Sequence, residues 1–114
     1  MISKHHRFHG PNSLNFVYRK GRSVRGEYMS LRFAGSRDDD YRLAVVVSKK
    51  VSKSAVVRNR IRRRIYEIVR VHRKESTTSW PKDLVISVFD DCMATMPADE
   101  MRNQVLKLLQ KSGL

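Results

Sequence analysis

The sequence has little of what marks several other classes of protein. It holds one cysteine, Cys92, so no disulfide can form within the chain, and nothing indicates an oxidising compartment. No apolar run approaches the roughly 20 residues that a membrane-spanning helix needs. Residues 1–10 lack the apolar core of a secretory signal. We therefore expect a cytoplasmic protein with no membrane partner, folded as a single domain over residues 1–114, with residues 1–10 as a flexible basic arm.

Acidic residues are scarce as well. Against 24 lysines and arginines there are 11 aspartates and glutamates, which gives a formal net charge of +13. Self-repulsion on this scale destabilises a compact monomer unless the charge serves a polyanionic partner. That partner could be RNA, DNA or an acidic membrane surface, and the composition favours nucleic acid.

Recognisable catalytic and metal-binding constellations are missing. His5, His6 and His9 lie close together, but no acid or cysteine nearby completes a metal site, so we assign them to the basic arm. The three aspartates at 38–40 are consecutive in a turn-rich stretch, where side chains rarely converge on one ion. No Ser/His/Asp arrangement or phosphate-binding glycine loop is visible. The sequence thus predicts neither catalytic residues nor metal ligands.

Apolar patterning predicts a sheet covered by helices. Residues 28–33 alternate, with Tyr28, Ser30 and Arg32 on the face opposite the core. The runs within 42–48 and 84–89 are typical of buried strands. A short helix is expected over residues 12–20, and a loop over residues 34–40. A final amphipathic helix after Pro97 carries the stripe Met101, Val105, Leu108 and Leu109.

What the sequence has in abundance is arginine, concentrated between Lys49 and Lys74. This segment holds eleven of the 24 cations and one acid, Glu67. We predict a helix here, capped by Ser52 or Ser54, with an apolar stripe made of Val57, Ile61, Ile65, Ile68 and Val69. A solvated helix would mix in acids, and guanidinium groups match phosphate oxygens bidentately. Because no helix-turn-helix or zipper accompanies it, we expect RNA and no DNA.

The motif Arg58-Asn59-Arg60 follows the strand end Ser48-Lys49-Lys50 and opens the Ile/Arg-rich helix. In this setting it resembles the bacterial ribonuclease P protein subunit. The order of the other predicted elements is similar to that family over nearly the whole chain. The resemblance implies an α/β two-layer sandwich with element order αβββαβα. It also implies a left-handed βαβ crossover made by the basic helix, as in the second domain of ribosomal protein S5.

The resemblance also implies a function and the residues that serve it. Such a protein assists a catalytic RNA, with its Mg²⁺ ions, in removing the 5′ leader from precursor tRNA, so the holoenzyme is an endoribonuclease whose chemistry belongs to the RNA. The residues assigned to the catalytic RNA are Lys50, Lys53, Arg58, Asn59, Arg60, Arg63 and Arg64. Those assigned to a cleft for the single-stranded leader are Leu14, Tyr18, Tyr28, Ser30, Arg32, Val46, Lys49 and Arg62.

Three other interpretations remain open on the sequence alone. A structural RNA-binding protein of the ribosomal type would share the charge but would need no leader cleft. A protein-only nuclease would cleave RNA unaided, although it would need a carboxylate cluster that is not visible. A membrane-surface or calmodulin-type helix would share the basic amphipathic pattern, yet the surrounding α/β chain gives it no reason to be free.

Overall fold

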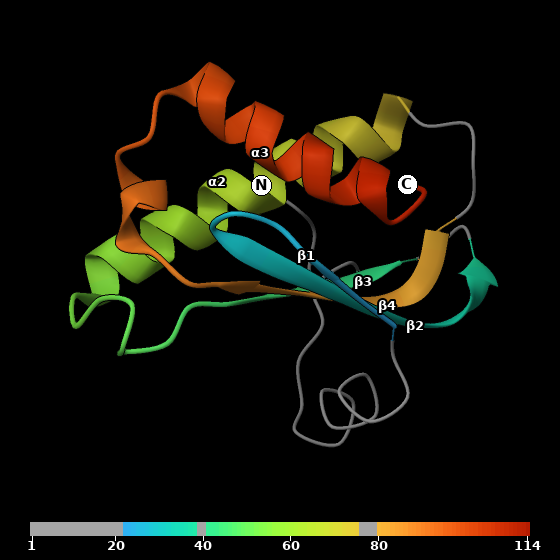
Figure 1. Ribbon diagram of the computed structural model, residues 1–114, viewed down its shortest axis with the longest axis horizontal. Helices are drawn as coiled ribbons and strands as arrows, with labels where there is room; N and C mark the ends of the chain where they lie inside the picture. The colour runs from blue at the N-terminus through green and yellow to red at the C-terminus, as the bar shows by residue number, and fades with distance from the viewer. Residues whose placement is uncertain (1–21, 39–40, 76–79) are drawn as a thin grey trace.

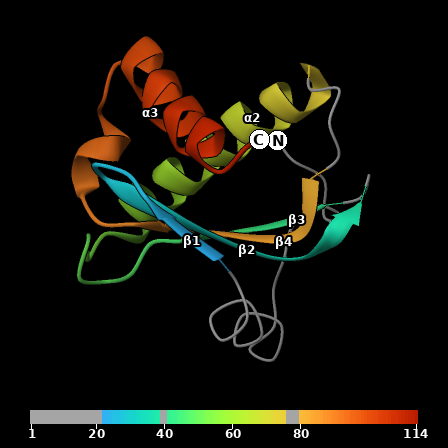
Figure 2. The ribbon, with the colours of Figure 1, turned by 45° about the vertical axis from the view of Figure 1, so that its right-hand side comes forward.

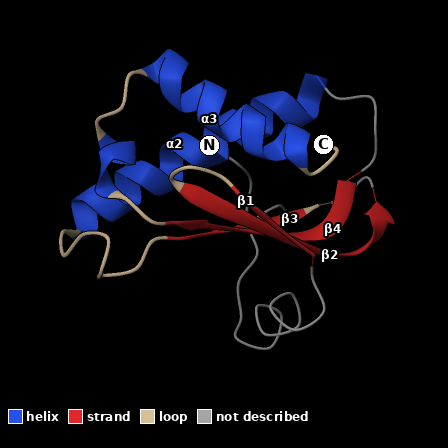
Figure 3. Cartoon of the chain, in the orientation of Figure 1, coloured by secondary structure: helices blue, strands red, loops and turns tan. Residues whose placement is uncertain are grey.

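The computed structural model describes residues 22–38, 41–75 and 80–114. In this part of the chain one sheet is covered on one face by helices (Figures 1 and 3). The predicted helix at 12–20 and the basic arm lie outside the described residues, and the order of the remaining elements agrees with the prediction. These elements are β1 (Arg22–Arg25), β2 (Met29–Asp38), β3 (Arg42–Val46), α2 (Ala55–Glu75), β4 (Trp80–Val88), the 3₁₀ helix η2 (Asp91–Ala94) and α3 (Ala98–Lys111).

The sheet has the strand order β1-β2-β4-β3, so β3 lies at its edge. Strand β4 is antiparallel to β2 and parallel to β3, which makes α2 the crossover between two parallel neighbours. Followed through Figures 1 and 2, the path from β3 through α2 to β4 turns in the left-handed sense. Crossovers of this kind are right-handed in nearly all proteins. The left-handed crossover therefore agrees with the fold that the resemblance implied.

The core lies between the sheet and the two helices. From β2 it takes Met29 and Leu31, as the alternation predicted, and from α2 it takes Ile61, Ile65 and Val69. Burying one such side chain is worth about 1.5–3 kcal/mol. The predicted stripe of α3 is buried in full, at Met101, Val105, Leu108 and Leu109.

The start of α2 and the end of α3 follow from local chemistry. Ser54 caps α2, because its Oγ accepts a hydrogen bond from the backbone N–H of Val57 at 3.3 Å. Helix α3 ends at Lys111, and Gly113 follows two residues later with a φ of 81°, in the left-handed region that glycine adopts without strain. The N–H of Leu114 then returns to the carbonyl of Leu109 at 2.9 Å, which closes the helix end.

Strand β2 is longer than the sequence indicated. The expected loop over residues 34–40 is wrong for residues 34–38, since the strand continues to Asp38. A bulge between Ala34 and Arg37 absorbs the irregularity, and Arg37 and Asp38 then pair with Pro81 and Trp80. Turn-forming residues did not end the strand because a bulge can accommodate an extra residue while pairing resumes beyond it.

The connection from β4 to α3 is held by an arginine that was assigned to RNA. This connection contains η2, which was not predicted, and Asp90 caps η2 by accepting a hydrogen bond from the N–H of Cys92 at 2.9 Å. Arg64 Nη1 donates to the carbonyl of Met93 at 2.8 Å, and its Nη2 donates to the carbonyl of Met96. Arg64 therefore fastens the connection to α2.

We expect Arg64→Ala to lower the free energy of unfolding by about 2 kcal/mol, because two backbone carbonyls lose a charged donor. Arg63→Ala is the matched control: it removes the same charge from the neighbouring position, where the side chain is exposed, and should change stability by less than about 0.5 kcal/mol. Urea unfolding followed by the fluorescence of the buried Trp80 measures both. Equal effects in the two variants would contradict the role given to Arg64.

Candidate nucleic-acid interface

A cationic surface is formed by the loop before α2 and the first turns of that helix. The side chains of Lys50, Lys53, Asn59, Arg60 and Arg63 are all exposed. The first turn of α2 contains no acidic residue, so the free N–H groups of the helix start add to the positive potential. A surface of this charge favours an anionic ligand such as phosphate.

Two further arginines are held in place within the same surface. Arg58 Nη1 donates to the carbonyl of Ser52 at 2.9 Å, which ties the loop to the helix. Arg62 Nη1 donates to Asn59 Oδ1 at 2.7 Å, and its Nη2 lies 3.4 Å from the carbonyl oxygen of Val47. A guanidinium that is already oriented loses less conformational freedom when it binds a phosphate.

The sheet face opposite the helices carries three residues of the predicted leader cleft. Ser30 pairs with Ser87, and Ser87 pairs with Val46, so these side chains form a row across β2, β4 and β3. Arg32 lies in the next row, beside Val85. None of the described helices covers this face (Figure 3). Its centre is a small apolar cluster of Ala34, Ala44, Val85 and Val46.

The edge of β3 brings the sheet face next to the cationic surface. Val46 ends the strand, Lys49 is exposed in the turn that follows, and Arg62 reaches this turn from α2. One helical turn further on, the Tyr66 hydroxyl lies 3.5 Å from the carbonyl oxygen of Leu43 in β3. The structure thus places Val46, Lys49 and Arg62 together. Leu14 and Tyr18, two further residues assigned to the cleft, lie outside the described residues.

Tyr28 does not share the face of Ser30 and Arg32, so that part of the strand prediction is wrong. It precedes β2 and packs against the core under the helices. Glu27 raises the pKa of its hydroxyl, and Cys92 and Glu100 add to the effect. The alternating pattern failed here because the chain bends at Glu27 and Tyr28 before the strand begins.

The sequence prediction missed an aromatic position at the end of the sheet row. The Arg25 guanidinium lies 4.6 Å from the centroid of the Phe89 ring, and Phe89 is 41% exposed. Register places Arg25 beside Ser30, in line with Ser87. The sequence did contain a signal for this position, because Phe89 continues the alternation of Val85 and Ser87 along β4 and so belongs to the same face of the sheet. An exposed ring under a guanidinium offers a stacking surface for a base.

Cys92 is the only cysteine of the chain, and its surroundings do not activate it as a nucleophile. Burial raises the pKa of the Cys92 thiol to about 11, with Asp90 adding to the shift, so the reactive thiolate is rare at neutral pH. Nowhere in residues 22–38, 41–75 and 80–114 do three His, Cys, Asp or Glu side chains converge as a metal-ligand group. Within those ranges, no helix is long and apolar enough to cross a bilayer.

Comparisons with known proteins point to one family. The family model described as Ribonuclease P matches residues 2–113. The chain is 30% identical over 113 residues to the ribonuclease P protein component of Roseiflexus castenholzii, covering 99% of this chain and 90% of that protein. It is 36% identical over 96 residues to that of Thermus aquaticus, covering 84% of this chain and 54% of that protein. The chain therefore spans about half the length of its Thermus relatives. Among solved structures, the Staphylococcus aureus RNase P protein is similar with a TM-score of 0.78 at 26% identity, covering 96% of each chain.

We expect Arg60→Ala to weaken binding to a structured RNA about tenfold at moderate salt, because one charge-assisted phosphate contact is lost. The slope of log affinity against log salt concentration should become shallower by about one, as expected when one phosphate contact is lost. Lys74→Ala, at the other end of the same helix, removes the same charge from an exposed site and serves as the control. Fluorescence anisotropy measures both. An equal loss in the control would mean that total charge, rather than this surface, binds RNA.

Proposed function

This chain belongs to the ribonuclease P protein family, and on that premise we propose that it is the protein component of a ribonuclease P. It binds the catalytic RNA and the 5′ leader of precursor tRNA, and it assists the endonucleolytic removal of the leader that gives the mature 5′ end. The holoenzyme works in the cytoplasm, and the RNA carries out the hydrolysis. A structural RNA-binding role of the ribosomal type is not favoured, because the family model matches nearly the whole chain.

The observation that carries the proposal is the meeting of two surfaces at the edge of β3. On one side Arg58, Asn59 and Arg60 open α2 and offer cations to the folded catalytic RNA. On the other, the sheet row ending at Val46 offers small polar and apolar side chains to an extended strand. Unpaired RNA suits such a face, because its bases can be splayed onto it while its phosphates meet cations at the rim.

Lys49 and Arg62 are the residues that join the two surfaces. Lys49 is exposed beyond the end of β3, and Arg62 is held between Asn59 and Val47. In the proposed complex they neutralise leader phosphates where the leader leaves the catalytic RNA. Arg25 and Phe89 lie at the opposite end of the row and extend the surface for the bases.

Mg²⁺ enters this function through the RNA. The side chains on the cationic surface are Lys, Arg and Asn, whereas Mg²⁺ prefers carboxylate and phosphate oxygens. The Asn59 Oδ1 atom is already used by Arg62. These residues do not fit a dedicated magnesium site, so we assign the Mg²⁺ ions mainly to the RNA partner and derive no step through a protein-bound ion.

Reconstitution tests the proposed function directly. The protein is mixed with a bacterial ribonuclease P RNA at low Mg²⁺, where the RNA alone is slow, and removal of the 5′ leader from precursor tRNA is followed. We expect stimulation, because the cations of the protein replace part of the ionic screening that the RNA otherwise needs. Absence of stimulation would refute the proposal, and cleavage by the protein without RNA would support a protein-only nuclease.

The leader surface gives a separate prediction. Lys49→Ala should weaken binding of precursor tRNA to the reconstituted holoenzyme about fivefold, or roughly 1 kcal/mol, and should leave mature tRNA unaffected. Mature tRNA has no leader, so it is the internal control for folding and assembly. Lys74→Ala controls for the loss of charge. If Lys49→Ala weakened both substrates equally, the residue would not contact the leader.

A further inference from the structure

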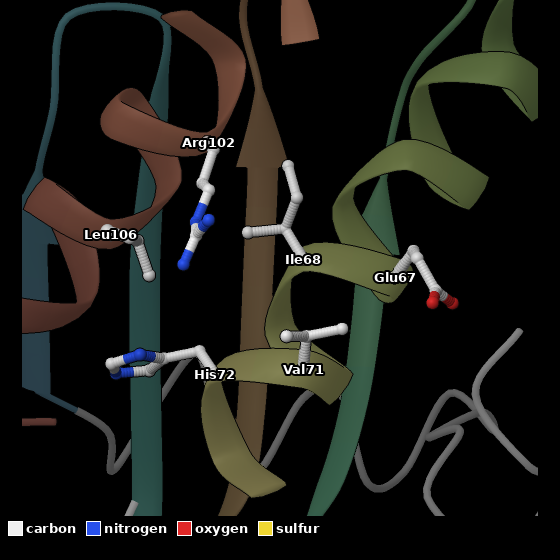
Figure 4. Close-up of a pocket in the computed structure, with 6 residues that line it drawn as sticks. All are labelled: Glu67, Ile68, Val71, His72, Arg102 and Leu106. Carbon is white, nitrogen blue, oxygen red and sulfur yellow. The ribbon is translucent and has the colours of Figure 1, made fainter. Parts of the chain in front are cut away.

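A groove runs between α2 and α3 on the helix layer, away from the sheet face and adjoining the cationic surface only at Arg63. It consists of two adjoining cavities of about 190 and 340 Å³ that share Glu67 and Ile68. Figure 4 shows the first of them, with α3 on one side and α2 on the other. The second continues along α2 towards Arg63 and Arg64, under Ala98 and Met101 at the start of α3.

The floor of this groove is apolar although it is open to solvent. Ile68 and Val71 come from α2 and Leu106 comes from α3, and each is only partly buried. In Figure 4 the side chains of Ile68 and Leu106 point into the space between the helices. Partly exposed aliphatic side chains in a groove of this kind favour an apolar occupant.

The rim of the groove is cationic. Arg102 is an exposed residue of α3, and its guanidinium reaches into the space between the helices (Figure 4). Arg63 lines the second cavity. Among the described residues that line the two cavities, the only acid is Glu67. It points away from α3 in Figure 4 and pairs with Arg70, whose Nε lies 3.2 Å from its carboxylate. Hydrogen bonding from Arg70 lowers the pKa of Glu67 to about 2, so this acid is committed to a neighbour.

We propose that the groove docks an acidic amphipathic helix of a partner protein. The occupant's apolar stripe lies on Ile68, Val71 and Leu106, and its carboxylates pair with Arg102 and Arg63. An RNA strand fits less well, because its bases stack best on aromatic rings, whereas the floor here is made of Ile68, Val71 and Leu106. The stretch from Ala98 to Leu106 is about 12 Å of helix, which matches a ligand with apolar residues at i, i+3 or i+4, and i+7.

Docking of this kind does not depend on the proposed function. The groove lies between the two helices, which cover one face of the sheet (Figure 2). The row of Ser30, Ser87 and Val46 lies on the other face. A partner in the groove therefore leaves the leader surface open, and one molecule could hold RNA and a second protein together.

The probe for the test is a fluorescein-labelled peptide of about 16 residues, with leucines at the i, i+4 and i+7 spacing and glutamates at the solvent-facing positions. A scrambled peptide of the same composition is its control, because a chain with a net charge of +13 attracts any acidic peptide. At about 0.15 M salt, where exposed charges are largely screened, we expect the patterned peptide to bind at least about tenfold more tightly than the scrambled one. Equal binding of the two peptides would overturn the proposal.

Charge reversal on α3 provides matched variants. Arg102→Glu should lower the affinity for the patterned peptide at least about tenfold, since an attraction between charges becomes a repulsion. Lys107→Glu makes the same change in net charge on the opposite flank of α3, where Lys107 lines a different cavity with Gly26, and should have little effect. Leader removal by the reconstituted holoenzyme should be the same for both variants. Equal weakening by both variants would show that the peptide binds by general charge attraction, and it would refute docking in the groove.

Chemical-shift mapping on the intact protein locates the peptide independently of any substitution. Shifts at Ile68, Val71, Arg102 and Leu106 are expected. Shifts confined to the loop before α2 and the Arg58–Arg60 turn would place the peptide on the nucleic-acid surface and overturn the proposal. A failure of leader removal in the reconstitution, with the peptide still bound in the groove, would refute the proposed function and leave this inference standing.

Discussion

The burial of one apolar stripe on α2 is the contact on which the rest of the structure depends. Ile61, Ile65 and Val69 lie against the sheet, and at about 1.5–3 kcal/mol each they offset part of the repulsion among the arginines beside them. The same contact determines where those arginines go. Because a helix turns about 100° per residue, holding the stripe on the sheet sends Arg62 towards β3, Arg64 towards η2 and Arg60 to solvent.

The arginines of α2 each add one positive charge, but they make different contacts. Arg64 uses both terminal nitrogens on backbone carbonyls, Arg62 bridges a side chain and a carbonyl, and Arg60 is exposed. A lysine would keep the charge at each position, but one ammonium cannot reproduce the two-pronged contacts. The arginines of α2 thus serve internal structure as well as the exposed cationic surface, and net charge alone overstates the share available to a polyanion.

Patterns that depend on one element were predictable from the sequence, and contacts between elements were not. The stripes of α2 and α3, the cap at Ser54 and the inward face of β2 each follow from local spacing or from one side chain. The role of Arg64 depends on η2, which lies about thirty residues further along the chain. Tyr28 was misplaced because a bend before β2 interrupts the alternation, and Phe89 was missed because its partner Arg25 comes from β1. The groove between α2 and α3 arises only when the two helices pack.

The side chains that α2 sends towards β3 have a further consequence. Strand β3 ends the sheet, and open strand edges can pair with other chains and start aggregation. Leu43 and Val47 are four residues apart, so in extended chain their carbonyls point the same way. Tyr66 and Arg62, one helical turn apart on α2, lie against these two carbonyls. The basic helix therefore covers part of the edge of its own sheet, and Arg62 makes this contact independently of any nucleic acid.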